Sequence, residues 1–309
     1  MAPAGSANAA ALARAARRER WREFRREPIE KLPPRSRYFN ISVLWVFYYP
    51  QLIRALYALG VRHEVVTGMS IASGLAAAGL IASTNSYLLL LLAALLVHGK
   101  DLFDACDGAL ARLTGTGHRT GRFLDTIGDG IAFTALIAAV AIRDAHSGSM
   151  PATVLLWSAA AWLSLFLQCS YFNYYQLHYI ARADGSTASR LDERDTAAEG
   201  PFLRMLVRIY CWWFAWQDQL IAWWDERARR LVALDGDANG APCEHWFTDR
   251  RFLIANSPLC YGTHAFVLIL CLVVSRPGWF FPAVVVVMNM YWAGIIVSRL
   301  AAYGHGNAR

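Results

Sequence analysis

The sequence predicts an all-α integral membrane protein with six membrane-spanning helices. Of its 309 residues, 56% are hydrophobic and twelve are tryptophans, a composition too apolar for an ordinary soluble domain. A helix needs about 20 mostly apolar residues to cross a hydrocarbon core of about 30 Å. Six stretches reach that length, near residues 66–84, 87–112, 121–142, 151–180, 252–275 and 279–300.

The distribution of basic residues places both termini in the cytoplasm. Lys and Arg near span ends accumulate on the cytoplasmic side of a membrane. Of the 30 Lys and Arg residues, only Arg143 and Arg276 fall at the span ends that this arrangement places outside. An even number of spans then brings the N- and C-termini to the same, cytoplasmic, side.

Residues 1–62 are predicted to form a cytoplasmic basic tail followed by an interfacial segment. The first 31 residues are rich in Ala and then Arg and lack the apolar core of a signal peptide. This tail is either a mobile extension or a basic helix attracted to anionic lipid. Residues 38–59 are apolar but contain Pro50, Gln51 and Arg54, which favours a segment lying along the inner membrane surface. A true span there would reverse the predicted sidedness.

Residues 63–309 are predicted to form the six-helix domain, interrupted by a cytoplasmic or interfacial insertion at 182–251. Within the insertion, 182–200 has the composition of a flexible connection, and 201–231 is predicted to be helical after Pro201. Arginines and five tryptophans suit a helix at the level of the lipid headgroups, with a soluble helix packed on itself as the alternative. The tryptophans are Trp212, Trp213, Trp216, Trp223 and Trp224.

Four aspartates interrupt the second and third predicted spans at regular spacing. In order, the fixed positions are Asp104, Asp107, Gly108, Ala111 and Arg112. Eight residues then separate Arg112 from Gly121, three residues separate Gly121 from Asp125, and three more separate Asp125 from Asp129. Residues three or four apart share one face of a helix. Because the two spans run in opposite directions, the rise per residue sets Asp107 level with Asp125 and Asp104 level with Asp129. The four carboxylates should converge about 6 to 12 Å from the inner ends of the helices, near the headgroup boundary.

Converging carboxylates repel one another, and one Asp at the centre of a membrane helix costs roughly 2.5 to 3.5 kcal/mol. A bound divalent cation would remove the repulsion, and all-oxygen ligation suits Mg²⁺ or Mn²⁺. The candidate metal ligands are therefore Asp104, Asp107, Asp125 and Asp129. Protonated aspartates that hydrogen-bond the helices together are the alternative. The eight histidines have no metal-ligand spacing, and only His118 lies near the aspartates.

Small residues beside the aspartates leave room for a ligand. Gly108 and Gly121 remove side chains where the two helices should face each other, so a pyrophosphate or nucleotide could enter. Arg112, at the cytosolic end of its span, can bind a phosphate with its guanidinium or can anchor the helix at the membrane surface.

At every fixed position, this motif resembles the signature of the CDP-alcohol phosphotransferases (CDP-alcohol phosphatidyltransferases), membrane enzymes that displace CMP from a CDP-linked alcohol with a second alcohol. The resemblance implies a six-helix fold, a homodimer and a polar cavity open to the cytoplasm. It also implies that Asp104, Asp107 and Asp125 hold the metal and that Asp129 is the general base. The CDP contacts implied are Asp104, Asp107, Gly108, Ala111, Arg112 and Gly121.

The resemblance also implies a phospholipid-synthesis reaction, in which a phosphatidyl group passes from CDP-diacylglycerol to a small hydroxyl acceptor with release of CMP. The span number and chain size are similar to the bacterial branches, which implies a bacterial inner or plasma membrane. The alternative is transfer of a phospho-alcohol from a soluble CDP-alcohol to a lipid acceptor, although the lipid-accepting relatives usually have more spans.

Two departures from the family pattern bear on the substrates. Members often carry a Pro-Asn pair shortly before a Thr at the start of the first span. Here His63 and Glu64 precede the Thr, and of that pattern only Thr67 is present. This departure puts Thr67 in doubt as a nucleotide contact. After Asp125 the chain lacks the Pro and Lys of the glycerophosphate-accepting branch, which favours a serine- or inositol-type acceptor, although Gly130 fits neither branch firmly.

Functions of other classes are also compatible with parts of the sequence. A proton- or metal-coupled carrier would place acids in the membrane, but nearer the midplane and in a path open to both sides. A structural scaffold would explain the aromatic and basic segments but not four facing aspartates. No nucleic-acid partner is expected.

Overall fold

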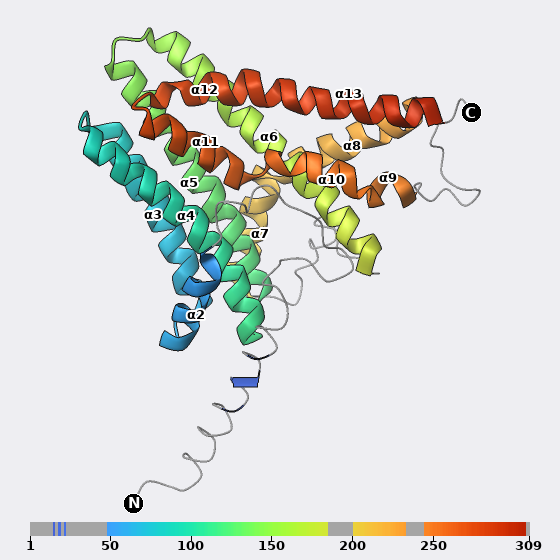
Figure 1. The fold of residues 1–309 in the computed structure, drawn as a ribbon, viewed down its shortest axis with the longest axis horizontal. Helices are drawn as coiled ribbons and strands as arrows, with labels where there is room; N and C mark the ends of the chain where they lie inside the picture. The colour runs from blue at the N-terminus through green and yellow to red at the C-terminus, as the bar shows by residue number, and fades with distance from the viewer. Residues whose placement is uncertain are drawn as a thin grey trace, which may run out of the picture.

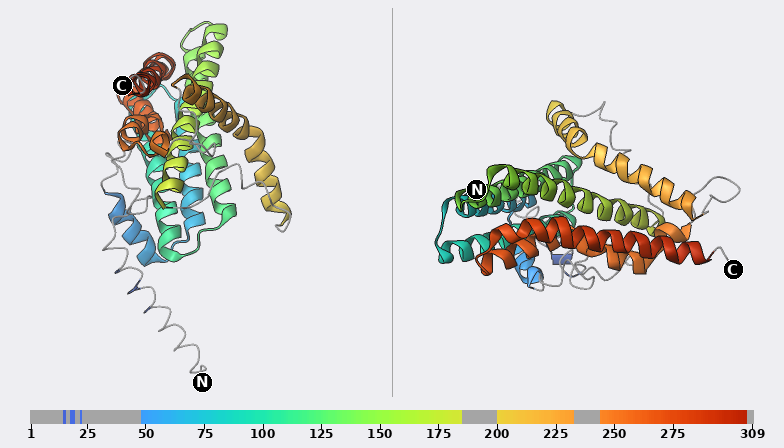
Figure 2. Two further views of the ribbon diagram at one scale, coloured as in Figure 1. Left: turned by 90° about the vertical axis from the view of Figure 1, so that its right-hand side faces the viewer. Right: turned by 90° about the horizontal axis from the view of Figure 1, so that it is seen from above.

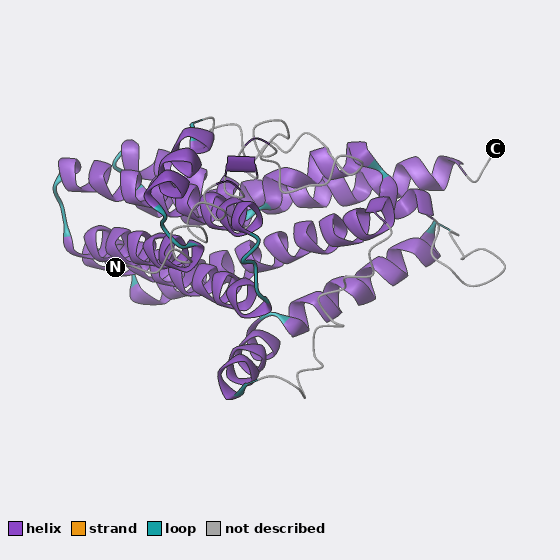
Figure 3. Ribbon diagram, turned by 90° about the horizontal axis from the view of Figure 1, so that it is seen from below, coloured by secondary structure: helices purple, strands orange, loops and turns teal. Residues whose placement is uncertain are grey.

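A computed structural model describes residues 48–184, 200–232 and 244–306, together with Ala15, Arg18, Glu19 and Arg22. Most of the predicted basic tail, residues 38–47 of the predicted interfacial segment, and the connections at 185–199 and 233–243 lie outside the described residues. Helices and connecting loops make up the described chain, which contains no strand (Figure 3). The prediction of an all-α protein is confirmed.

Three antiparallel helices form the part of the molecule that carries the aspartates. Helix α3 (His63–Ser83) packs against both α4 (Tyr87–Thr114) and α5 (Arg119–His146), as Figure 1 shows. Helix α4 ends at Gly115, whose left-handed φ of 65° lets its N–H bind the carbonyl of Arg112 at 3.3 Å. The loop 115–118 then leads into α5, and α3, which packs closely on both α4 and α5, holds the two helices in one layer.

Helix α2 (Tyr49–Leu59) packs against α4 beside this loop. Pro50 lies in its first turn, where a missing N–H costs nothing, instead of in mid-helix as the sequence suggested. With 11 residues, α2 is about 16 Å long and too short to cross a membrane by itself. It buries Ile53 and Leu56 in a small core with the end of α4.

Four described helices are long and apolar enough to span a membrane, or five if a bent pair counts as one span. These four are His63–Ser83, Thr120–His146, Pro151–Arg182 and Pro277–Gly304. The protein is therefore an integral membrane protein. The predicted second span, α4, is absent from this set although it has 28 residues. Every 18-residue stretch of α4 contains the three charged residues Lys100, Asp101 and Asp104, and the helices in the set have an apolar stretch with at most two.

The predicted fifth span is bent. Helix α10 (Arg250–Asn256) continues as the short 3₁₀ helix η4 (Ser257–Leu259), and a bend of 41° separates these from α11 (Tyr261–Val273). Pro258 has no N–H to donate to the helix, and Cys260 has an extended backbone, so the hydrogen-bond ladder is interrupted between them. The predicted sixth span is continuous through η5 (Pro277–Trp279), α12 (Phe280–Pro282), the π-helical turn η6 (Ala283–Met288) and α13 (Asn289–Gly306).

Helices α6 (Pro151–Asp184) and α13 extend away from the α3–α5 layer toward the C-terminal end of the molecule (Figures 1 and 2). There they enclose a second hydrophobic core with α8 (Ala215–Leu231), α9 (Glu244–Thr248) and α10. Its polar centre is the buried carboxylate of Asp225, which accepts hydrogen bonds from Tyr175 Oη at 2.6 Å, Trp246 Nε1 at 2.7 Å and Arg229 Nε at 3.0 Å. These bonds fix α8 against α6 and α9.

The tryptophan-rich segment consists of two helices, α7 (Pro201–Trp213) and α8 (Ala215–Leu231), where the sequence suggested one. The break occurs at Phe214, whose side chain is 2% exposed and packs in the core against Phe166. Of the five tryptophans, Trp212, Trp216 and Trp223 are exposed. Trp213 instead packs over Trp162, so part of this segment is a core element beside α5 and α6.

Close packing of α3 on its neighbours gives a prediction about Gly74. A methyl group at Gly74 would lie 2.9 Å from Cβ of Ala132 and 3.3 Å from Cγ of Lys100, whereas one at Gly79 on the same helix meets no atom within 4 Å. Replacing Gly by Ala normally stabilises a helix by roughly 0.5–1 kcal/mol, but overpacking costs about 1–3 kcal/mol. We expect Gly74→Ala to lower the thermal unfolding midpoint in detergent and Gly79→Ala to leave it equal or higher. Equal midpoints for the two variants would contradict the packing described here.

Candidate active site

Helices α4 and α5 bring acidic side chains together at the end of the layer that adjoins α2. Asp104 and Asp107 come from α4, and the carboxylate of Asp104 interacts electrostatically with those of Asp107 and Asp129. Asp107 is buried, with 5% of its surface exposed, and the other two are half-buried. Asp125 is half-buried one turn before Asp129 on α5. Asp104 and Asp129, which are 25 positions apart, thus come near each other because α4 and α5 both pack on α3.

Helix α3 supplies a hydroxyl group that holds one of these carboxylates. Thr67 Oγ1 donates a hydrogen bond to Asp107 Oδ2 over 2.6 Å, and both residues are buried. The hydroxyl also lies 3.2 Å from the carbonyl of His63, one turn earlier on α3. Thr67, whose predicted role as a nucleotide contact was doubtful, therefore orients Asp107 in this structure. A hydrogen bond of this kind fixes the rotamer of a carboxylate and directs its other oxygen.

Lys100 is a site residue that the sequence analysis missed. Its side chain is 1% exposed, and its ammonium group forms an ion pair and hydrogen bond with Asp129 Oδ1, linking α4 directly to α5. The ammonium also lies 5.0 Å from the centre of the Phe133 ring. Ser70 Oγ on α3 donates to the carbonyl of Lys100 over 2.9 Å, so main chain and side chain are both held.

The sequence did contain a signal for Lys100. Among its 30 basic residues the chain has only two lysines, Lys31 and Lys100, and the second lies inside an apolar run. It also lies four residues before Asp104, on the face that carries the aspartates. A lone ammonium in a membrane segment of an Arg-rich chain indicates a function for the charge itself, because burying it is costly unless it is paired.

The small residues of the motif lie against polar side chains. A methyl group at Gly108 would lie 3.4 Å from Arg112 Nη1, so the Arg112 side chain lies over Gly108 at the end of α4. Arg112 is exposed and Ala111 is half-buried. At Gly121 the corresponding neighbour is His63 Nε2, at 3.6 Å. The two glycines thus let a guanidinium and an imidazole approach the helix backbone, and these are groups that can bind phosphate or a base.

Among the described residues, one group offers three potential metal-binding side chains whose ligand atoms lie close together, and it does not include the aspartates. His63, Glu64 and His118 offer ligand atoms within 4.8 Å of one another, near the start of α3 and α5. However, Arg62 already binds both carboxylate oxygens of Glu64, at 2.9 and 3.2 Å, and Thr116 Oγ1 lies 3.1 Å from His63 Nδ1. These contacts engage Glu64 and one nitrogen of His63, whereas the buried His63 Nε2 has no hydrogen-bond partner within the described part of the chain.

The aromatic junction between α7 and α8 packs beside Asp129. A methyl group at Gly130 would lie 3.1 Å from Phe214 Cζ and 3.5 Å from two ring atoms of Trp213. Gly130, which fits neither the serine nor the inositol branch firmly, is thus needed for the close approach of this junction to α5. The predicted insertion therefore borders the candidate site.

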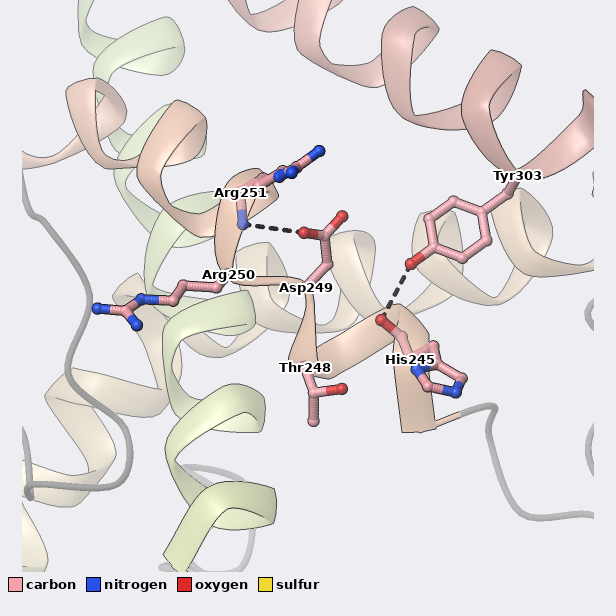
Figure 4. A pocket seen from close by; sticks show the side chains of 6 residues that line it. All are labelled: His245, Thr248, Asp249, Arg250, Arg251 and Tyr303. Atoms are coloured by element: carbon pink, nitrogen blue, oxygen red, sulfur yellow. Dashed lines mark hydrogen bonds between the residues drawn. The ribbon is translucent and has the colours of Figure 1, made fainter. Parts of the chain in front are cut away.

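A surface pocket of about 340 Å³ lies at the opposite end of the molecule, where α9, α10 and α13 meet (Figures 1 and 4). Its polar groups serve the fold: Asp249 accepts from the backbone N–H of Arg251 at 2.9 Å and of Phe252 at 3.2 Å, and Tyr303 Oη donates to the carbonyl of His245 at 2.9 Å. Because these atoms are already paired and the aspartates are elsewhere, this pocket is not the candidate active site.

Fold and site together define an all-α integral membrane protein in which two antiparallel helices bring carboxylates together at one end of a helix layer. In a comparison with protein families, residues 64–225, just over half of the chain, match the CDP-alcohol phosphatidyltransferase family, and the protein belongs to that family. It is therefore a transferase of substituted phosphate groups that acts in membrane lipid synthesis. A comparison with curated proteins gave no significant match.

Proposed function

We propose that the protein transfers a phosphatidyl group from CDP-diacylglycerol to a small hydroxyl acceptor of the serine or inositol type and releases CMP. The observation that carries this proposal is the set of carboxylates on α4 and α5, with Asp107 held by Thr67 and Asp129 paired with Lys100, near Gly108 and the Arg112 side chain that lies over it. With a divalent cation such a site would bind the charged pyrophosphate, and a carboxylate outside the cation's ligands would accept a proton.

A divalent cation fits the residues present. Asp104, Asp107 and Asp125 would bind Mg²⁺ or Mn²⁺, since both ions favour oxygen ligands and the Thr67 hydrogen bond leaves Oδ1 of Asp107 to face a ligand. When bound, the cation supplies positive charge to the pyrophosphate. Arg112 would bind a phosphate at the end of α4, while Gly108, Ala111 and Gly121, with Asp104 and Asp107, would border the CDP.

Asp129 is proposed as the general base, with the option that it also contributes to the metal site. Its Oδ1 is occupied by Lys100, so Oδ2 would take the proton of the acceptor hydroxyl. The acceptor oxygen then forms a bond to the β-phosphorus, the bond from that phosphorus to the CMP oxygen breaks, and CMP leaves as the anion. Positioning and charge neutralisation would supply most of the rate.

The direction of transfer is also part of the proposal. The chain size and the six predicted spans, fewer than the lipid-accepting relatives usually have, favour CDP-diacylglycerol as donor over a soluble CDP-alcohol. We further propose that residues 1–62 are a cytoplasmic tail with an interfacial segment and that 63–309 form the catalytic domain with an insertion at 182–251. Its active site would face the cytoplasm in a homodimer with cytoplasmic termini, in a bacterial inner or plasma membrane.

The proposed reaction can be tested with purified protein in detergent or vesicles. CDP-diacylglycerol and Mg²⁺ would be supplied with tritiated serine, inositol, inositol phosphate or glycerol phosphate in separate reactions. We expect CMP release and a labelled lipid with one of the first three acceptors. Label in lipid only after adding a soluble CDP-alcohol and diacylglycerol would overturn the proposed donor. Ion flux in vesicles without nucleotide, together with no CMP release, would favour a carrier.

The bond from Thr67 to Asp107 gives a further prediction. Thr67→Val keeps the shape of the side chain but removes the donor, so Asp107 loses its orientation. We expect the Mn²⁺ concentration for half-maximal CMP release to rise by about 10- to 100-fold, the usual effect of losing a group that orients a metal ligand. Thr67→Ser keeps a hydroxyl and should stay close to the unmutated protein. Equal Mn²⁺ requirements for the Val and Ser variants would contradict this role.

A further inference from the structure

The ion pair between Lys100 and Asp129 distinguishes one aspartate of the site from the others. Side chains of both residues are nearly removed from solvent, at 1% and 12% exposed. Because the site contains four aspartates of the same chemistry, something other than residue type must decide which one acts as base. Among the described residues, Lys100 is the ammonium group in contact with this cluster, and it contacts Asp129.

The position of Lys100 is held by groups from three helices. Gly74 of α3 makes room for its stem, the Ser70 hydroxyl binds its carbonyl, and the Phe133 ring of α5 lies near its ammonium. A long, flexible side chain confined in this way keeps its charge at one point. The ammonium therefore acts as a fixed positive charge against Oδ1 of Asp129, and it also interacts electrostatically with Asp104 and Asp101.

A fixed ammonium and a divalent cation compete for the same carboxylate. Two positive charges repel at short range, and this repulsion is strong where water is largely excluded. A carboxylate that is already paired with an ammonium is consequently a poorer metal ligand than its neighbours. The cation should be held by Asp104, Asp107 and Asp125, with Asp129 kept outside its coordination.

We propose that Lys100 is a positioning residue that holds Asp129 away from the divalent cation and presents its free oxygen to the acceptor hydroxyl. This inference rests on the proposed function, because it assigns the base within the same site. The contact with Lys100 explains why Asp129 would act as base while the other three aspartates would bind the cation. It also makes a prediction about metal binding that does not depend on the identity of the acceptor.

The test compares four variants by titration with Mn²⁺ alone, with binding monitored by electron paramagnetic resonance. Lys100→Met keeps the length of the side chain but removes the charge, so Asp129 can join the metal ligands. We expect this variant to bind Mn²⁺ about 10-fold more tightly than the unmutated protein and to release CMP about 100-fold more slowly. Asp129→Asn should change Mn²⁺ affinity by less than about 3-fold, because Asp129 is outside the coordination.

The double variant Lys100→Met/Asp129→Asn separates positioning from a general structural effect. Its Mn²⁺ affinity should return to that of the unmutated protein, since the additional ligand is gone. Weaker or unchanged Mn²⁺ binding by Lys100→Met would overturn the proposal, with thermal unfolding showing that the variant is folded. Lys100→Arg keeps the charge and should restore the unmutated Mn²⁺ affinity.

The two proposals fail in distinguishable ways. If the unmutated protein releases no CMP from CDP-diacylglycerol while the Mn²⁺ affinities follow the predicted pattern, only the proposed reaction is wrong. If Lys100→Met releases CMP at the unmutated rate, the positioning role is wrong and the reaction stands.

Discussion

Asp129→Asn is expected to lower kcat for CMP release by about 10²- to 10⁴-fold while leaving CDP binding largely unchanged. The amide cannot accept the proton of the acceptor hydroxyl, whereas the proposed metal ligands and CDP contacts on α4 remain. The substitution also leaves the buried Lys100 ammonium without its carboxylate, and breaking a buried ion pair costs roughly 3–5 kcal/mol. The measurements are kcat for CMP release, calorimetric CDP affinity and the thermal unfolding midpoint.

Asp144→Asn provides the matched control for Asp129→Asn. Asp144 lies near the other end of α5, so the control makes the same chemical change on the same helix away from the site. We expect it to keep both CMP release and CDP binding. If Asp129→Asn released CMP at the unmutated rate, the assignment of Asp129 as base would be wrong.

Asp107→Asn is expected to weaken Mn²⁺ binding by about 10³-fold and to reduce CMP release to the limit of detection. Asp107 is 5% exposed and is fixed by Thr67, so no nearby solvent-exposed group can replace its charge. Losing one carboxylate from a divalent-cation site removes several kcal/mol of charge stabilisation. The effect would be measured by Mn²⁺ titration and by the rate of CMP release at saturating Mn²⁺.

Comparison of the two variants separates the proposed roles. Asp107→Asn should lose the cation, whereas Asp129→Asn should keep it and lose only turnover. Asp144→Asn serves as the control for Asp107→Asn as well, because Asp144 lies near the other end of α5, away from the site. A variant Asp107→Asn with the Mn²⁺ affinity of the unmutated protein would remove Asp107 from the metal site.

Hydrophobic length predicted the long helices well, because a run of about 20 apolar residues has few alternatives to a membrane helix. Hydrophobic length alone did not predict the bend at Cys260, although Pro258, two residues earlier, is a residue that interrupts a helical hydrogen-bond ladder. The division of the tryptophan-rich segment into α7 and α8 at Phe214 could not be predicted for a different reason. Phe214 carries no sequence signal of a helix end, and its burial against Phe166 is a tertiary contact.

The candidate site shows a similar limit. Spacing along two helices predicts which side chains share a face, and the sequence placed Asp104 near Asp129 on that basis, as the structure does. Partners of those side chains come from far along the chain: Thr67 is 40 residues from Asp107, and Lys100 is 29 residues from Asp129. Helical periodicity carries no information on the pair Thr67–Asp107, because it depends on how α3 packs across α4. It does place Lys100 on the face of α4 that carries Asp104, but not against a particular carboxylate of α5.

The most direct test of the central claim is anomalous diffraction from crystals grown with Mn²⁺ and CDP. The claim is that carboxylates of α4 and α5 jointly hold a divalent cation next to the pyrophosphate. We predict an anomalous peak within about 2.0–2.6 Å of oxygens from Asp104, Asp107 and Asp125, with the phosphates of CDP on its open side. A peak at His63, Glu64 and His118 instead, or aspartates that share no cation in the presence of CDP, would contradict the account.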